Sequence, residues 1–115
     1  MPAITPAVDR TETVRHIRSF HARRSRIRPS AAAALDRLWP LWGIEIDADF
    51  NFAETFSSTD SVVLEIGCGM GDATVAMAAA DPSTTILAVD VHTPGLGVLL
   101  RDSDRLGLQN VRVAE

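Results

Sequence analysis

Three glycines at alternate positions directly follow a short apolar run in the middle of this 115-residue chain. The run is Val62–Ile66, and the glycines are Gly67, Gly69 and Gly71. A continuous apolar run of this length predicts a strand that is buried on both faces of a parallel sheet. Glycines directly after it predict a tight turn, and a small-residue helix is expected at 72–80. This strand, turn and helix are typical of the start of a doubly wound sheet.

The same alternation continues toward the C-terminus. Residues 86–89 predict a second strand that ends at Asp90, and residues 110–114 predict a third. Between them we expect a helix over 93–106 with Thr93 as its N-cap. The predicted fold class is therefore α/β, a partial Rossmann-like fold in which β-α-β-α-β forms half of a doubly wound sheet.

In doubly wound sheets of this kind the first strand is central, and its far edge is covered by a further strand. No segment of the sequence supplies that strand. An open apolar edge favours association with other strands. We therefore expect the chain to be an N-terminal fragment, a truncated product or one piece of a larger assembly, with possible self-association through the exposed edge.

Two classes of cofactor use a glycine-rich turn of this kind. The dinucleotide fingerprint needs a glycine where this chain has Asp72. S-adenosylmethionine (SAM) fits better, because Glu65 would repel a pyrophosphate but attract the cationic sulfonium and ammonium groups of SAM. Asp90 can accept hydrogen bonds from both ribose hydroxyls. A turn without a ligand, and an Asp90 that only caps the next turn, are the alternatives. The predicted cofactor-binding residues are Glu65, Gly67, Gly69, Gly71 and Asp90.

Charge is distributed unevenly, and it divides the chain into three parts. Residues 1–30 contain seven arginines and two acids, whereas residues 31–115 contain four arginines and thirteen acids, and lysine is absent. We expect residues 1–29 to be a basic flexible extension, 30–60 a helix and an acidic connector, and 61–115 the SAM-binding half of the domain. Guanidinium groups match phosphate geometry, so the extension suits a polyanion, although a solvated leader without a partner is the alternative. The predicted RNA-binding residues are Arg18, Arg23, Arg24, Arg26 and Arg28.

The helix of the second part is predicted from an alanine-rich stretch. Ser30 is expected as its N-cap and Pro40 as its end. The predicted buried stripe consists of Leu35, Leu38, Trp39 and Leu41.

Several classes of function lack a sequence signal. No apolar run is long enough to span a membrane, and the N-terminus lacks the apolar region of a signal peptide. Cys68 is the only cysteine, which fits a reducing compartment, so a cytoplasmic location is expected. His16 and His21 lack partners at metal-ligand spacing, and no metal is predicted. His92 is interpreted as a local hydrogen-bonding residue rather than a base.

The chain resembles the first half of the bacterial tRNA (guanine-N7-)-methyltransferase family. The resemblance covers roughly residues 15–115. It rests on the segments Arg18-Ser19-Phe20, Leu38-Trp39-Pro40, Leu64–Gly71, Val89–Gly97 with its His-x-Pro-Gly-x-Gly motif, and Leu108–Val113.

The resemblance implies SAM-dependent methylation of guanosine N7 in the variable loop of tRNA. It implies that Glu65 and Asp90 are the SAM-binding acids, with Asp90 in place of the family's more frequent glutamate, and that the basic extension contacts tRNA. The family's catalytic motif is expected beyond Glu115, so this chain alone is expected to be inactive. A SAM methyltransferase with another substrate, and a non-catalytic remnant that binds RNA or a partner subunit, are the alternatives.

Overall fold

The computed structural model describes residues 27–57 and 61–115. Arg18, Arg23, Arg24 and Arg26 of the predicted basic extension therefore lie outside the described residues, whereas Arg28 is described and exposed. The helices are α2 (Pro29–Trp42), α3 (Phe52–Thr55), α4 (Asp72–Ala80) and α5 (Thr93–Arg105), and the strands are β1 (Ser61–Ile66), β2 (Thr84–Val89) and β3 (Val111–Ala114).

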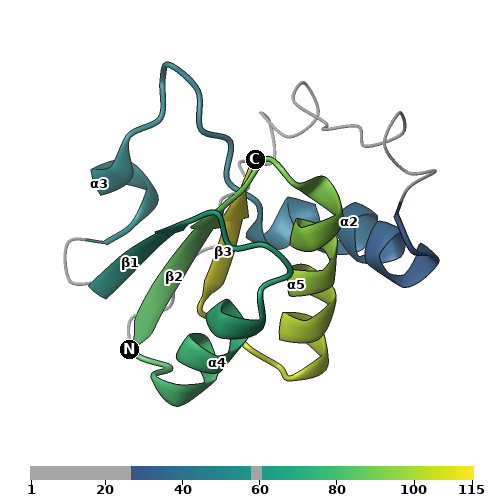
Figure 1. The fold of residues 1–115 in the computed structure, drawn as a ribbon. Coiled ribbons are helices and arrows are strands. Elements are labelled where there is room, and N and C mark those ends of the chain that lie inside the picture. The colour runs from purple at the N-terminus through teal and green to yellow at the C-terminus, as the bar shows by residue number, and fades with distance from the viewer. Residues whose placement is uncertain (1–26, 58–60) are drawn as a thin grey trace.

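The three strands form one parallel sheet in the order β1-β2-β3. Ser61 pairs with Thr84 in register, and Ile86 pairs with Val111, so the carboxyl ends of all three strands lie at the same edge (Figure 1). Helices α4 and α5 are the crossover connections. The predicted α/β, partial Rossmann-like arrangement is confirmed.

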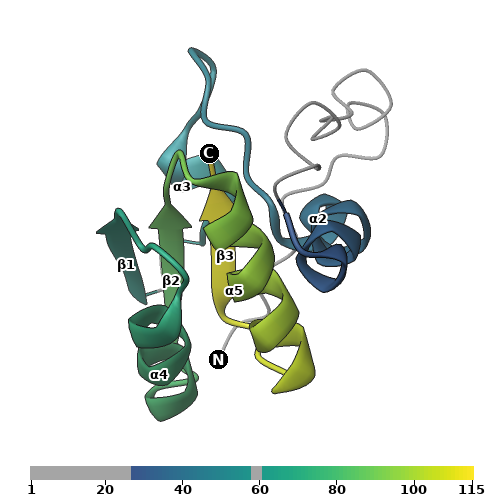
Figure 2. The ribbon, with the colours of Figure 1, turned by 45° about the vertical axis from the view of Figure 1, so that its right-hand side comes forward.

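Two hydrophobic layers cover the sheet. Helices α4 and α5 lie in front of it and α3 behind it, while α2 lies beside α5 (Figure 2). On the front face, Ile86 and Val113 pack with Leu35 of α2 and Leu99 of α5 in the main core. On the back face, a smaller cluster joins Leu87 and Ala114 to connector residues Ile44 and Phe56, with Phe50 packed against it.

The two edges of the sheet differ. Gly43 forms an isolated parallel bridge with Val113, and the Ile44 amide donates to the Val113 carbonyl at 2.7 Å, so the connector after α2 protects the β3 edge. Within residues 27–57 and 61–115, no strand pairs with the outer edge of β1.

The prediction that the first strand is buried on both faces is wrong for this structure. Leu64 is 53% exposed and Ile66 is 77% exposed. Both lie on the same face as Leu87 and Val89, because directly paired residues of parallel strands point the same way. The connector cluster covers Leu87 but leaves the end of β1 uncovered.

Helix α2 differs from the sequence prediction at both ends. It begins at Pro29 after Arg28 and continues through Pro40 to Trp42. Proline suits the first turn of a helix, where its missing amide hydrogen costs nothing. Near the C-terminus Pro40 removes a single intrahelical bond, and the Gly43 amide closes the helix on the Trp39 carbonyl at 2.7 Å.

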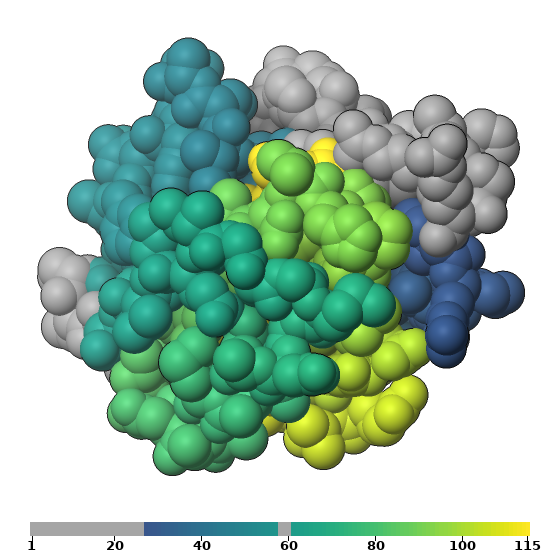
Figure 3. All heavy atoms as spheres, in the orientation of Figure 1, coloured from purple at the N-terminus to yellow at the C-terminus, as the bar shows by residue number. Residues whose placement is uncertain are grey.

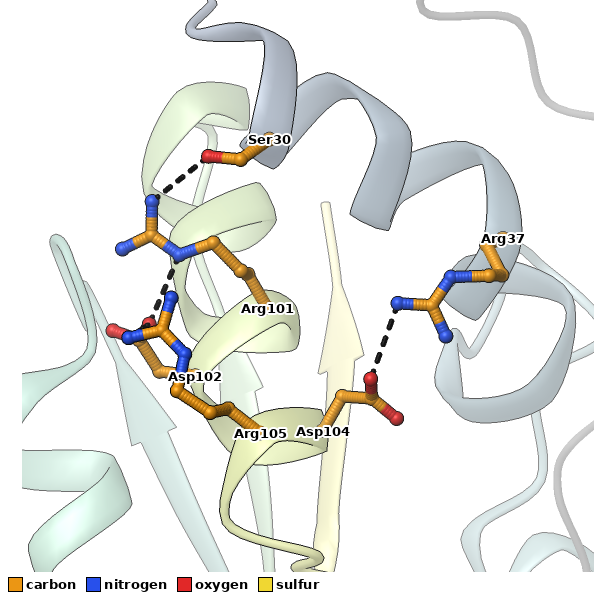
Figure 4. Close-up of polar contacts among 6 residues, drawn as sticks. All are labelled: Ser30, Arg37, Arg101, Asp102, Asp104 and Arg105. Atoms are coloured by element: carbon orange, nitrogen blue, oxygen red, sulfur yellow. Dashed lines mark hydrogen bonds and ion pairs between the residues drawn. The ribbon is translucent and has the colours of Figure 1, made fainter.

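Polar contacts also fasten α2 to α5 (Figure 4). The Arg101 guanidinium donates to the Ser30 hydroxyl at 3.1 Å, and Arg37 pairs with Asp104 at 3.1 Å. Ser30 therefore binds α5 rather than capping its own helix. Of the predicted stripe, Leu35, Leu38 and Trp39 are buried, whereas Leu41 is exposed.

The ends of α5 also differ slightly from prediction. His92 occupies the N-cap position, Thr93 is the first helical residue, and the helix ends at Arg105. The Thr93 hydroxyl donates to the Glu115 carboxylate instead of capping the helix, which ties the start of α5 to the end of β3.

Candidate cofactor site

The glycine turn connects β1 to α4 at the carboxyl edge of the sheet. Its three glycines all have positive φ, at 80° for Gly67, 61° for Gly69 and 86° for Gly71. Residues other than glycine rarely adopt a positive φ, so the backbone of this turn requires glycine at the alternate positions. The Gly67 amide donates to the Val89 carbonyl at 2.7 Å, which continues the pairing of β1 with β2 into the turn.

The glycines differ in what surrounds them. A Cβ built on Gly71 would lie 2.8 Å from the Leu99 side chain, so Gly71 allows the turn to pack on α5. A Cβ built on Gly67 or Gly69 would meet nothing within 4 Å. The segment between β1 and α4 lies at the surface against α5 (Figure 3). Its backbone is therefore open to a ligand at Gly67 and Gly69.

Asp90 follows β2 and contacts the glycine turn directly. Its Oδ2 accepts a hydrogen bond from the Gly69 amide at 2.8 Å, and its Oδ1 accepts one from the His92 amide at 2.9 Å. These two amides lower the pKa of the Asp90 carboxyl, with Gly69 as the larger cause. A carboxylate oxygen has two lone pairs, so each oxygen retains one for a further donor such as a ribose hydroxyl. Asp90 thus caps its own turn, as the alternative interpretation required, and also reaches the glycine turn.

Glu65 lies near the end of β1 and is half-buried. The hydroxyl of Thr74 in α4 donates to its carboxylate. Thr74 is completely buried, and this contact was not predicted from the sequence. The sequence offered one signal for this contact. Thr74 is the third residue of the helix that follows the turn, which brings it near Glu65 at the end of β1.

The electrostatic environment of the turn is negative. Burial, together with the negative charges of Asp90 and Glu65, raises the pKa of the Cys68 thiol to about 11. Both carboxylates therefore act on the same point of the turn. Such a field suits a cationic ligand and opposes a pyrophosphate. The raised pKa also makes Cys68 a poor nucleophile.

Within residues 27–57 and 61–115, no group of three or more potential metal ligands occurs. None of the described helices is long and apolar enough to cross a membrane.

Comparisons with known proteins identify the family. A family profile described as putative methyltransferase matches residues 59–115, the segment that contains the glycine turn and Asp90. A tRNA (guanine-N(7)-)-methyltransferase of Streptomyces avermitilis is 56% identical over 114 residues, or 98% of this chain. Its counterpart in Klebsiella pneumoniae is 43% identical over 112 residues, or 96% of this chain. The chain belongs to the tRNA (guanine-N(7)-)-methyltransferase family and corresponds to the N-terminal portion of its members.

The match covers only part of each relative. The aligned region is 39% of the S. avermitilis protein and 47% of the K. pneumoniae protein. The chain thus spans less than half the length of these family members. Nearly the whole of this chain takes part in the match, but the part of each relative outside the match is longer than the matched part.

Proposed function

We propose that this chain forms the cofactor-binding part of an enzyme that transfers a methyl group from SAM to N7 of guanosine in the variable loop of tRNA. One observation carries the proposal. The glycine turn after β1 is held against Asp90 at the carboxyl edge of a parallel sheet, which is where open α/β sheets bind their ligands. The names of the relatives supply the reaction and the substrate.

The residues around the turn fit SAM. Bound SAM supplies an activated methyl group on a sulfonium. In this proposal Asp90 accepts hydrogen bonds from the ribose hydroxyls, and Glu65 accepts one from the methionine ammonium group. Gly67 and Gly69 let the backbone approach the ligand closely. The two carboxylates also complement the positive charge of the cofactor.

Guanine N7 has a lone pair and carries no proton in the neutral base, so methyl transfer to it requires no general base. The enzyme's contribution is then positioning and electrostatics. We propose that the catalytic residues belong to the further segment that the relatives possess. The present chain alone would bind SAM without transferring its methyl group.

The basic extension supports tRNA as the partner. Arginine contacts with phosphates give affinity that depends on salt and little on sequence. Arg28 is exposed at the start of α2 and is the described member of this set. Arg18, Arg23, Arg24 and Arg26 complete the proposed RNA contact. A substrate of this kind is consistent with a cytoplasmic location.

The open edge of β1 supports a second element of the proposal. A parallel strand with Leu64 and Ile66 exposed lacks the cover that such strands normally have. We propose that the further segment of the relatives covers this edge in the complete protein. Without it, self-association is the expected consequence. Light scattering across a concentration series should show oligomers that Ile66→Lys disperses, and a monomer at all concentrations would contradict this.

Binding and transfer assays on the purified chain test the proposal. Isothermal titration should show SAM binding that Asp90→Ala weakens by about 1–3 kcal/mol. Filter retention of tRNA should fall when Arg23, Arg24 and Arg26 are replaced by glutamine. Arg105→Gln, at an exposed arginine at the end of α5, is the control. Transfer of tritiated methyl groups to tRNA should stay at background.

Each alternative gives a distinct result. SAM binding that Asp90→Ala leaves unchanged would contradict the site assignment. SAM binding without tRNA retention favours a methyltransferase for another substrate. tRNA retention without SAM binding favours a non-catalytic remnant, and methyl transfer above background would contradict the inactivity of the isolated chain.

A further inference from the structure

The His-x-Pro-Gly-x-Gly motif lies in the first turns of α5, and its two glycines contact different parts of the molecule. A Cβ built on Gly95 would overlap the carbonyl oxygen of Gly69 and would lie 2.9 Å from Nδ1 of His92. A Cβ built on Gly97 would lie 2.8 Å from the Ala31 carbonyl oxygen and 3.2 Å from Leu35 in α2. One glycine therefore allows contact with the cofactor turn, and the other allows contact with α2.

Gly69 is held from two sides. Its amide donates to Asp90, which also accepts from the His92 amide. The His92 carbonyl in turn accepts from the Gly95 amide at 3.0 Å, and the Cα of Gly95 faces the Gly69 carbonyl. These contacts form a closed circuit through Gly69, Asp90, His92 and Gly95. A side chain at position 95 would overlap the Gly69 carbonyl, so the backbone that also carries the Gly69 amide would have to shift.

We propose that Gly95 is a positioning residue for the cofactor turn. Its lack of a side chain allows α5 to pack against the Gly69 carbonyl, and the amide of the same residue then stays hydrogen-bonded to Asp90. The turn is then shaped before a ligand arrives, which reduces the ordering cost of binding. The consequence for the cofactor rests on the proposed function, whereas the consequence for the turn itself does not.

Gly95→Ala and Gly97→Ala form a matched pair of variants. Both sites lie among the first five residues of α5, so alanine favours the helix by at most about 1 kcal/mol at each. The chain's two tryptophans, Trp39 and Trp42, both lie in α2. Their fluorescence reports whether α2 stays packed on α5. Hydrogen exchange of the Gly69 amide, measured by NMR on the ligand-free chain, reports the state of the turn.

The two variants should give opposite results. Gly95→Ala should speed exchange of the Gly69 amide and raise the Kd for SAM, each about tenfold, as expected for the loss of one hydrogen bond worth about 1.4 kcal/mol. Its tryptophan emission should match that of the wild type. Gly97→Ala should shift the tryptophan emission and leave Gly69 exchange unchanged. Asp90→Asn, which weakens the same bond without adding a Cβ, should also speed Gly69 exchange.

Three outcomes would overturn the proposal. Unchanged Gly69 exchange in folded Gly95→Ala would show that α5 does not hold the turn. Equal effects of Gly95→Ala and Gly97→Ala on Gly69 exchange would show only a general loosening of α5. Failure of Gly95→Ala to fold would make Gly95 a core residue of the domain rather than a positioning residue. If the wild type does not bind SAM, the proposed function fails, and Gly69 exchange still decides the role of Gly95.

Discussion

Replacing Thr74 by valine tests whether the buried hydroxyl holds Glu65 in place. Valine has nearly the same shape as threonine, so packing in the buried site is retained while the hydrogen bond to the carboxylate is lost. A hydrogen bond to a charged group is worth about 1.5–3 kcal/mol. Glu65 is only half-buried and water can replace part of the bond, so we expect the lower end of that range. A loss of about 1.5 kcal/mol corresponds to a roughly tenfold weaker affinity for SAM.

Thr74→Ser is the matched control, because it keeps the hydroxyl and removes a methyl group. Burial of one such group contributes about 0.8 kcal/mol. Serine should therefore lower the free energy of unfolding in urea by about 1 kcal/mol while preserving SAM affinity per folded molecule. Valine should weaken SAM binding measured by isothermal titration. This role for Thr74 would be refuted if the valine variant bound SAM as tightly as the wild type while the serine variant bound SAM more weakly.

Three further predictions concern stability and reactivity. The two side-chain N–H groups of buried Asn110 are shared among the carbonyls of Ala78, Asp81 and Thr84, which lie 3.0, 3.1 and 2.8 Å from Nδ2. Asn110→Ala should therefore lower the free energy of unfolding by about 2–3 kcal/mol, and an unchanged urea midpoint would contradict this. Hydrogen bonds from Ser83 and Thr84 lower the pKa of Asp81, and those from the Gly69 and His92 amides lower the pKa of Asp90. The two ionised carboxylates therefore stabilise the folded state fully above the ordinary carboxyl pKa of about 3.9, and this stabilisation is lost as the pH falls below it. A thermal midpoint that rises on acidification from pH 5 to pH 3 would contradict this. The pKa of Cys68, raised to about 11, leaves little thiolate at pH 8. Its reaction with a disulfide reagent should be roughly a hundredfold slower than in the urea-unfolded chain, and equal rates would contradict the burial of Cys68.

Local patterns in the sequence predicted most of the fold. Helix α4 occurs at Asp72–Ala80 as expected, because the glycine turn marks its start and Asp81-Pro82 its end. The three strands lie within one or two residues of their predicted positions. Apolar runs and turn residues act locally, so a single sequence is sufficient to read them.

The errors concern contacts between distant segments. The apolar run of β1 predicted burial on both faces, but burial depends on which elements cover the strand, and α3 and the connector do not cover Leu64 and Ile66. Ser30 has the chemistry of an N-cap, yet its hydroxyl accepts from Arg101 in α5.

The candidate site shows the same division. The spacing of Glu65, the glycines and Asp90 was readable, because the strands that carry them are adjacent and parallel. The contributions of Thr74 and Gly95 were not predicted. They depend on how α4 and α5 pack on the turn. Thr74 contacts Glu65, which is 9 residues away in the sequence, and the backbone of Gly95 closely approaches the backbone of Gly69.

The most direct test of the SAM site is an NMR titration of the labelled chain with SAM. The amides of Gly67, Gly69 and Gly71 and of the residues after Asp90 should shift saturably, and Asp90→Ala should weaken the response. S-adenosylhomocysteine, which shares the nucleoside but lacks the sulfonium charge, should shift the same amides. Shifts confined to other surfaces, or no shifts in a folded chain, would contradict a SAM site at this turn.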